Sequence, residues 1–271
     1  MPDRIAPVVD FDTELAGQFR LDGKVAFLPG GYGGIGEAIA WSLALAGARV
    51  IVAGRSRDKA DAFAGSLNEA GYPADGYGLD CEQVSQIDDV VAAIAAEHGR
   101  IDILINCVGM QREQPLRDVT EEAFDQVFRV NLKAAMFLGQ AVAARQIAAG
   151  DGGKQVHLLS VRSQLGLRGR GYSAYCASKG GLVMLVRQHA MELAPHRINV
   201  NGIAPTFIYT EQIRHVMEND EFRTGLLDRI PLGRIGDPKD IAGAGHFFAS
   251  PASDFVTGQI LYVDGGITAS Q

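Results

Sequence analysis

The chain has 271 residues, 47% of them hydrophobic and 21% charged, with 33 glycines and 10 prolines. No G-x-y repeat accompanies the glycines, which excludes collagen and a Pro/Gly-rich linker, and no run approaches the roughly 18 apolar residues of a membrane span. With 25 Lys and Arg against 32 Asp and Glu, the net charge of −7 argues against a general affinity for nucleic acid or anionic membranes.

Short apolar runs alternate with helical patterns along nearly the whole chain. In chain order, we expect a strand at residues 24–29, a helix at 35–46, a strand at 49–53, a helix at 58–70, a strand at 77–79, a helix at 84–97, a strand at 101–106, a helix at 121–149, a strand at 155–160, a helix at 173–193, a strand at 198–203, a helix at 239–250 and a strand at 259–263. Such apolar strands predict a parallel sheet with helices on both faces. The expected fold class is α/β, a single doubly wound, Rossmann-type sheet of about seven strands.

No linker or shift in composition divides this pattern. We therefore expect a polar N-terminal arm at residues 1–20 and one Rossmann-type domain at residues 21–271. The long irregular segment at 205–237 is expected to be a substrate lid, because such insertions are usually lids or binding loops.

The cysteines and histidines predict neither a disulfide framework nor a metal site. Cys81, Cys107 and Cys176 are widely spaced, without a CxxC pair, and the six histidines show no paired metal spacing. The first 18 residues lack the apolar core of a signal peptide. We expect reduced thiols, no metal and a cytoplasmic protein.

A glycine cluster separates the first expected strand from the first expected helix. Gly31-x-Gly33-x-x-Gly36 fits the G-x-G-x-x-G pattern, and Gly30-x-x-x-Gly34-x-Gly36 fits a wider-spaced variant. Between a strand and a helix, such glycines let the backbone approach a pyrophosphate, whose charge sits at the helix N-terminus. The alternative is a plain tight turn.

The acidic residue that holds the ribose 2′-hydroxyl of NAD(H) is missing from the end of the second expected strand. Gly54 takes that place, and Arg55, Ser56 and Arg57 follow it. Two guanidiniums beside a missing carboxylate favour NADP(H), because they can pair with a 2′-phosphate. NAD(H), with arginines that are merely solvated, stays the alternative.

Tyr175 and Lys179 lie four residues apart, on one face of the expected helix at 173–193. Ser160 ends the preceding strand, at the edge of the sheet where ligands bind. Reduction of a carbonyl by hydride needs a proton for the developing alkoxide, and a tyrosine with a reference pKa of about 10 needs a nearby cation to exchange protons at neutral pH. Lys179 is placed to supply that cation, and Ser160 to hydrogen-bond the substrate oxygen.

Together these motifs resemble the short-chain dehydrogenase/reductase family, over residues 21–268. The family's TGxxxGIG motif corresponds to residues 29–36, and its catalytic Asn, Ser, Tyr and Lys correspond to Asn131, Ser160, Tyr175 and Lys179. The resemblance implies an oxidoreductase that transfers a hydride between a nicotinamide cofactor and a secondary alcohol or ketone. It also implies that Lys179 binds the nicotinamide ribose and that Asn131 supports a proton-relay water.

The same resemblance implies further cofactor contacts. The adenine-contacting aspartate corresponds to Asp80, the NNAG strand end to residues 106–109, and the segment bordering the nicotinamide to residues 203–205. The expected cofactor-binding residues are Gly30, Gly34, Ile35, Gly36, Arg55, Asp80, Asn106, Gly109, Tyr175, Lys179 and Pro205. The chain departs from the family pattern at Pro29, Cys107-Val108 and Thr206. Ser160 precedes Tyr175 by about two residues more than is usual, which leaves Ser163 as the alternative catalytic serine.

Arginines gather on the loops around the expected site. Arg112 follows the Gly109 turn, and Arg162, Arg168 and Arg170 precede Tyr175. They can bind a carboxylate or phosphate, or else lie on a solvated or intersubunit face. The segments 109–112 and 160–166 are similar to the gluconate 5-dehydrogenase and sugar-acid branch of the family. This implies a sugar, polyol or sugar acid as substrate, with Ser160, Arg112, Arg162 and Tyr175 as substrate-binding residues.

Two other functions stay open from the sequence. A 3-oxoacyl-[acyl-carrier-protein] reductase would use the same arginines against the acidic face of its carrier. A non-catalytic cofactor-binding sensor would keep the nucleotide site and lose the tyrosine. The resemblance also implies a homotetramer, or a homodimer, in which Met184, Leu185 and Leu193 belong to the core or to a helix–helix subunit interface.

Overall fold

The structure is a computed structural model that describes residues 15, 17–213, 218 and 220–270. Most of the expected arm, residues 1–14 and 16, lies outside the described residues, as do 214–217 and 219 of the expected lid.

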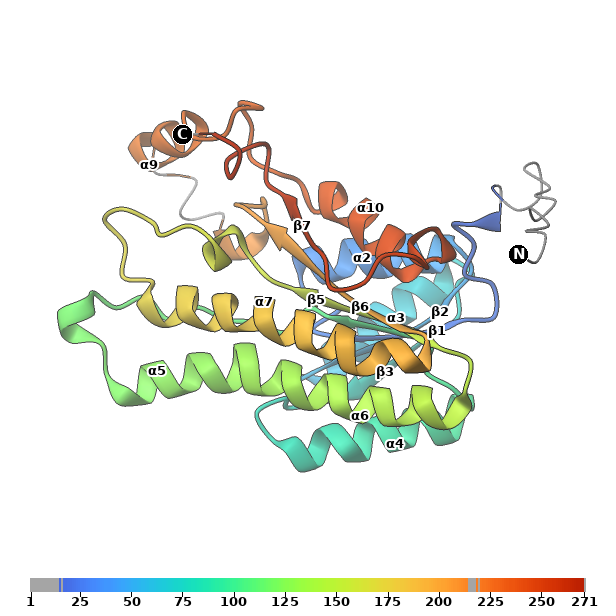
Figure 1. Cartoon of the computed structure of the whole chain (residues 1–271). Coiled ribbons are helices and arrows are strands. Elements are labelled where there is room, and N and C mark those ends of the chain that lie inside the picture. Colours follow the sequence, from blue (N-terminus) through green and yellow to red (C-terminus); the bar gives the residue numbers. More distant parts are fainter. Residues whose placement is uncertain (1–14, 16, 214–217, 219, 271) are drawn as a thin grey trace, which may run out of the picture.

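Parallel strands form one sheet through the centre of the molecule (Figure 1). They are β1 (Val25–Pro29), β2 (Arg49–Gly54), β3 (Ala74–Gly78), β4 (Ile103–Asn106), β5 (Gly153–Leu158), β6 (Ile198–Pro205) and β7 (Ile260–Val263). Their order across the sheet is β3-β2-β1-β4-β5-β6-β7, and every neighbouring pair is parallel. The predicted doubly wound α/β fold is confirmed, and the chain reverses its direction of winding between β1 and β4.

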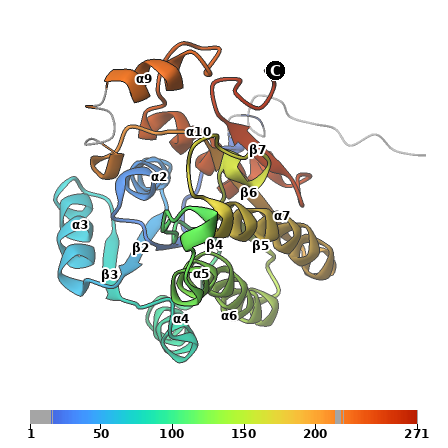
Figure 2. The same cartoon turned by 90° about the vertical axis from the view of Figure 1, so that its left-hand side faces the viewer.

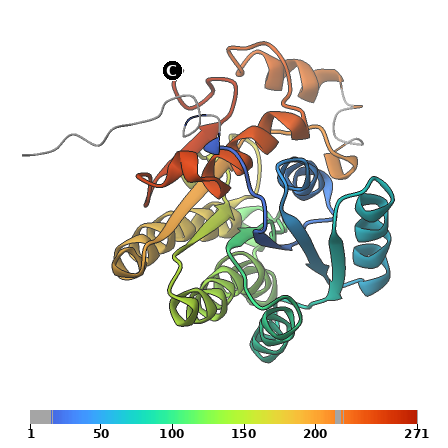
Figure 3. The same ribbon diagram turned by 90° about the vertical axis from the view of Figure 1, so that its right-hand side faces the viewer.

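Helices cover both faces of the sheet (Figures 2 and 3). One layer contains α2 (Gly34–Leu45), α3 (Arg57–Glu69) and α10 (Pro238–Ala249), and the other contains α4 (Val84–His98), α6 (Ala134–Ala149) and α7 (Ser173–Leu193). None of the helices in the described ranges is long and apolar enough to cross a membrane.

Strand β1 shows how the sheet supplies a core to each layer. Ala26 and Leu28 pack with α2, α3 and α10, whereas Val25 and Phe27 pack with α4 and α6. Successive side chains of a strand point to opposite faces, so an unbroken apolar run fills both cores. This burial fixes the central strands, whose carboxyl ends carry the candidate site.

The helix expected at 121–149 is interrupted. It consists of α5 (Glu121–Phe128), a π-helical turn η2 (Arg129–Lys133) and α6. Thr120 caps the start of α5 by accepting a hydrogen bond from the Ala123 amide at 3.2 Å. Hydrophobic periodicity does not reveal the π turn, because all three pieces continue one helical path; such turns occur frequently at functional sites.

Strands β3 and β5 begin before the expected ranges. Residues 74–78 of β3 pair in register with 50–54 of β2, although their buried and partly exposed positions alternate. An edge strand of this kind lacks the continuous apolar run that identifies the central strands. The expectation at 77–79 therefore located only its end.

The segment at 205–237 contains a short 3₁₀ turn, η5 (Glu211–Ile213), and helix α9 (Asp220–Leu227). Leu226 and Ile230 pack with Val161 and Ile267 in a small separate core. Figures 1 and 2 show α9 at the same end of the molecule as the loop that leads into α7. The insertion is thus anchored beside the carboxyl ends of β5 and β6.

Candidate active site

The glycine cluster lies at the point where the winding of the sheet reverses. The amide of Gly30 donates to the Ala53 carbonyl at 2.7 Å, and the amide of Cys107 donates to the Pro29 carbonyl at 2.9 Å. The loops that leave β1, β2 and β4 are therefore joined by backbone hydrogen bonds. In open α/β sheets, ligands bind in the crevice at this position.

Several of these glycines leave no room for a side chain. A Cβ on Gly36 would lie 2.6 Å from the Gly30 carbonyl oxygen, and one on Gly30, where φ is +76°, would lie 2.9 Å from the Cys107 carbonyl carbon. A Cβ on Gly34 would meet Thr210 at 2.5 Å. No side chain caps the N-terminus of α2, so its first amides face the crevice without an intrahelical partner. This cradle fits a pyrophosphate.

At the end of β2, the ring of Tyr32 covers the position where an acidic side chain would stand. A Cβ on Gly54 would overlap the Tyr32 ring, and the Tyr32 hydroxyl accepts a hydrogen bond from the Ser56 amide at 3.2 Å. Tyr32 was not among the expected site residues. The one feature of the sequence that could have indicated it is the presence of an aromatic residue inside the glycine cluster, while Gly54 ends the neighbouring strand.

The two candidate phosphate-binding arginines have different surroundings. Arg57 donates to both carboxylate oxygens of Asp61 at 2.8 Å and lies over the Tyr77 ring. Arg55 is exposed and has no hydrogen bond or ion pair with any described residue. Arg55 is therefore the arginine available to an anionic ligand.

Asp80, the expected adenine contact, lies just beyond β3, where its Oδ1 accepts a hydrogen bond from the Glu82 amide at 3.1 Å.

Tyr175, Lys179 and Ser160 converge at the carboxyl end of β5. Lys179 is 3% exposed, and its Nζ donates to the Leu158 carbonyl at 2.7 Å and lies 5.9 Å from the centre of the Tyr175 ring. Burial lowers the pKa of Lys179 to about 8. Burial raises the pKa of Tyr175, and a hydrogen bond with Ser160 and the charge of Arg162 oppose that rise. The cation that opposes the rise in the Tyr175 pKa is thus Arg162, and not the predicted Lys179.

Ser160, rather than Ser163, faces Tyr175. The Ser160 Oγ also accepts a hydrogen bond from the Arg162 amide at 3.1 Å, at the start of the 3₁₀ turn η3 (Val161–Ser163). The Ser163 hydroxyl instead lies 3.3 Å from the Tyr262 hydroxyl, on β7. The turn after β5 directs Ser160 toward Tyr175 on α7 and Ser163 toward Tyr262 on β7.

Asn131 connects the loop after β4 to α7 from within the π turn. It is 1% exposed; its Oδ1 accepts from the Met110 amide at 2.8 Å, and its Nδ2 donates to the Met110 carbonyl and to Ser178 Oγ. A Cβ on Gly109 would lie 3.4 Å from Lys179 Nζ and 3.5 Å from Asn131 Oδ1. These are ordinary van der Waals distances, so the loop after β4 packs directly against both side chains.

Two further expected cofactor residues end the neighbouring strands. Asn106 is 2% exposed, and its Oδ1 accepts from the Val108 amide at 3.0 Å, which shapes the loop after β4. Pro205 ends β6, and the next residue, Thr206, has a buried hydroxyl without a hydrogen-bond partner in the described part of the chain. A buried hydroxyl of this kind at the crevice fits a polar cofactor group.

The four arginines expected near the substrate separate into two groups. Arg112 is turned onto α5, where it donates to Gln126 at 2.9 Å, and Arg170 pairs with Glu113 at 2.7 Å. Arg162 is 4% exposed and lies at the reaction centre, whereas Arg168 is exposed on the loop before α7. Arg162 is the one whose backbone amide bonds to Ser160.

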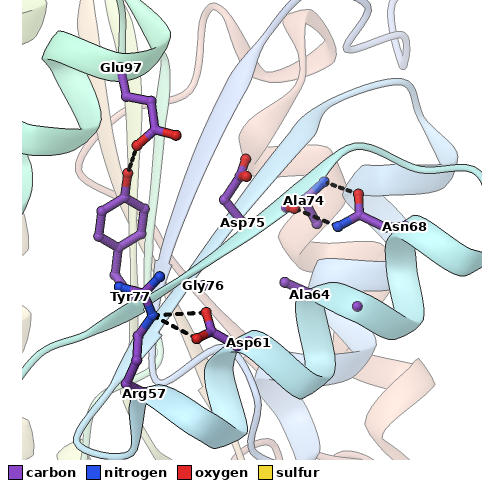
Figure 4. Close-up of a pocket in the computed structure, with 10 residues that line it drawn as sticks. Arg57, Asp61, Ala64, Asn68, Ala74, Asp75, Gly76, Tyr77 and Glu97 are labelled. Atoms are coloured by element: carbon purple, nitrogen blue, oxygen red, sulfur yellow. Dashed lines mark hydrogen bonds and ion pairs between the residues drawn. The ribbon is translucent and has the colours of Figure 1, made fainter.

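A separate cavity of about 350 Å³ lies away from this site, between α3, β3 and α4 (Figure 4). The Arg57–Asp61 pair, the hydrogen bond of Tyr77 with Glu97 and that of Asn68 with Ala74 occupy its polar side chains. It contains none of the expected catalytic residues.

Comparisons with known proteins agree with this geometry. The family described as Enoyl-(Acyl carrier protein) reductase matches residues 31–268. The chain is 38% identical over 252 residues to gluconate 5-dehydrogenase of Gluconobacter oxydans (93% of this chain, 97% of the relative), and 36% identical over 249 residues to a 3-oxoacyl-[acyl-carrier-protein] reductase of Thermotoga maritima (92% and 99%). A crystal structure of a Burkholderia cenocepacia gluconate 5-dehydrogenase in complex with NADP and tartrate superposes with a TM-score of 0.91 at 36% identity, covering 95% of this chain and all of that one.

Proposed function

The chain belongs to the short-chain dehydrogenase/reductase family, and we propose that its substrate is a sugar acid or a polyol. It is an oxidoreductase that acts on a secondary alcohol or the corresponding ketone. The observation that carries the assignment is the convergence of Ser160, Tyr175 and Lys179 beside a glycine cradle. A cofactor-binding protein without catalysis would have no need of this group.

In the proposed reaction, bound NADP(H) supplies or accepts the hydride. Ser160 donates a hydrogen bond to the substrate oxygen, and Tyr175 gives its proton to that oxygen during reduction and removes it during oxidation. Burial holds the phenol in its protonated form, which suits a donor, while Arg162 limits the rise of its pKa. Lys179, mostly protonated at neutral pH, presents its ammonium group to the nicotinamide ribose.

Asn131 acts by position in this scheme. Its side-chain amide is engaged by Met110 and Ser178, so it joins the loop after β4 to α7. The proposed proton-relay water would be held near Asn131 at this π turn, where the regular helical hydrogen-bond ladder is interrupted.

NADP(H) is the proposed cofactor. The cradle of Gly30, Gly34, Ile35 and Gly36 would hold its pyrophosphate, and the free Arg55 would pair with the 2′-phosphate. Asp80 would contact the adenine, and Asn106, Gly109 and Pro205 would border the nicotinamide riboside. NADP in the Burkholderia relative supports this choice. Arg55→Ala should weaken NADPH much more than NADH, and equal effects on both would contradict the assignment.

The sugar-acid assignment draws on the relatives named above and on the tartrate, a dicarboxylate, held by one of them. A second candidate, 3-oxoacyl-[acyl-carrier-protein] reductase, is favoured by the Thermotoga relative. Docking of an acidic carrier is charge-driven, so that activity should fall steeply with added salt. Turnover of free sugars that does not depend on salt would exclude it.

We also propose a homotetrameric, cytoplasmic protein. Met184 and Met191 on α7 are 58% and 60% exposed, and Phe124 on α5 is 41% exposed. Large apolar side chains on neighbouring helices are typical of a surface that a second subunit covers. Light scattering coupled to gel filtration tests this, and a monomer would contradict it.

The function is tested by NADPH and NADH consumption across keto-sugars, keto-sugar acids and acetoacetyl esters, with the reverse reaction on the alcohols. We expect turnover of at least one keto-sugar or keto-sugar acid, and loss of about 10²- to 10⁴-fold in Tyr175→Phe. Absence of oxidation or reduction of every compound by the wild type would refute the enzyme assignment. Equal activity of Tyr175→Phe would refute the role of the tyrosine.

A further inference from the structure

A cavity of about 370 Å³ lies between the loop that precedes α7 and helix α9. It is lined by Leu167, Arg168, Arg170, Phe207, Glu221, Gly225, Leu226 and Arg229. Its volume is within the range of small-molecule sites, about 300–1,000 Å³. Three arginines and one glutamate line it, in a chain whose net charge is −7. The cavity is therefore a local concentration of positive charge on an acidic protein.

Two of these arginines lack an acidic partner. Arg168 and Arg229 are exposed, and their side chains make no hydrogen bond or ion pair with the residues that the structure describes. Arg170 differs, because Glu113 pairs with it. The exposed arginines of the cavity are thus available to an anion that enters from solvent.

Arg162 does not line the cavity, but its guanidinium is bound to the carbonyl of Gly166, the residue before the lining Leu167. Arg162 Nη1 donates to the Gly166 carbonyl at 2.7 Å and to the Leu165 carbonyl at 3.3 Å, whereas its buried Nη2 has no partner in the described ranges. Burial and then the charge of Arg229 lower the pKa of Arg162, so these two cations repel each other. A buried charged donor without a partner is costly, and an incoming anion would relieve that cost.

We propose that this cavity is the carboxylate subsite of the substrate pocket, in which Arg229 and Arg162 bind the carboxylate of a sugar acid. The inference rests on the proposed function. The reacting hydroxyl is at Ser160 and Tyr175, and the amide of Arg162 donates to Ser160 at 3.1 Å. Only Val161 separates Ser160 from Arg162 in the chain. The subsite therefore selects a substrate that carries both the reacting hydroxyl and a carboxylate. Arg168 contributes to the positive field that attracts the anion.

The test compares Arg229→Ala with the wild type on D-gluconate and on D-glucitol, which has the same carbon chain without the carboxylate. We expect KM for gluconate to rise about 10- to 100-fold, as for the loss of a charge-assisted hydrogen bond, and KM for glucitol to change less than about twofold. Added salt should raise KM for gluconate alone. Arg223→Ala is the matched control, because Arg223 lies on α9, six residues before Arg229, and pairs with Asp220.

Calorimetric titration of gluconate into the protein with NADP⁺ separates failure of the subsite from failure of the proposed function. Gluconate that binds the wild type and not Arg229→Ala supports the subsite even without turnover. Equal binding by both proteins, or equal KM changes for gluconate and glucitol, overturns it. 6-Phosphogluconate carries a carboxylate and a phosphate, whereas 6-phosphoglucitol carries only the phosphate. If Arg229→Ala weakens binding of 6-phosphogluconate and leaves that of 6-phosphoglucitol unchanged, the carboxylate assignment is supported. If it weakens both equally, phosphate is the ligand and the carboxylate assignment is overturned.

Discussion

Tyr32 and Gly54 together determine how the adenosine end of the site receives NADH, and Gly54→Asp tests this. The substitution restores the carboxylate that holds the ribose 2′-hydroxyl in NAD-dependent folds. A Cβ at position 54, however, overlaps the Tyr32 ring. The ring therefore has to leave, and it gives up the hydrogen bond from the Ser56 amide and its packing against the core.

We place this loss at about 2 kcal/mol: about 1 kcal/mol for a neutral hydrogen bond and about 1 kcal/mol for the apolar surface of a half-buried ring. NADH binds only the form in which the ring has left and the new carboxylate stands in its place, so a cost of that size weakens NADH binding about 30-fold. Gly54→Asp alone should lose NADPH, because two negative charges about 4 Å apart repel by up to about 4 kcal/mol, and should gain little NADH affinity. Tyr32→Ala/Gly54→Asp has no ring to displace and should bind NADH about 30-fold more tightly than Gly54→Asp.

Dissociation constants from cofactor fluorescence, measured for the wild type, both single variants and the double variant, complete a double-mutant cycle. Tyr32→Phe/Gly54→Asp is the matched control, since phenylalanine keeps the ring and removes only the hydroxyl; it should recover only the share due to the hydrogen bond. A coupling energy below about 0.5 kcal/mol for NADH would refute the reasoning.

Three more predictions follow from the site. Ser160→Ala should lower kcat for keto-sugar reduction about 10²- to 10³-fold, whereas Ser163→Ala, which loses one hydroxyl contact with Tyr262, should change it less than about threefold; the reverse ranking would move the catalytic role to Ser163. Gly36→Ala forces a Cβ to 2.6 Å from the Gly30 carbonyl and should weaken NADPH at least about tenfold by titration, whereas Gly33→Ala, whose nearest atom is at 3.7 Å, should not; equal affinities would contradict the cradle. Lys179 loses its proton as the pH rises through about 8, so NADPH should bind about fivefold more weakly at pH 9.5 than at pH 7 in the wild type and equally at both in Lys179→Met; a flat wild-type profile would argue against a charged lysine in cofactor binding.

The sequence by itself determined the features that depend on spacing along one element. Alternating apolar runs predicted the doubly wound sheet, and the four-residue spacing of Tyr175 and Lys179 placed both on one face of α7. Ser160 is the predicted catalytic serine because it ends the apolar run at residues 155–160, and in the structure it lies beside Tyr175. These patterns are local, since the periods of helices and strands fix which residues share a face.

The tertiary structure decided which arginine side chains already pair with other residues of the protein and which are available to a ligand. Arg55 and Arg57 are equivalent in the sequence, but Asp61 takes up Arg57; Arg112 is held by α5, while Arg162 reaches the reaction centre. Tyr32 over Gly54 and Arg229 beside Arg162 join distant segments that no spacing rule connects. A side chain's availability depends on competing partners brought in by packing. For that physical reason only the structure separated Arg55 and Arg162 from Arg57 and Arg112, all of which the sequence had offered, and only the structure added Arg229.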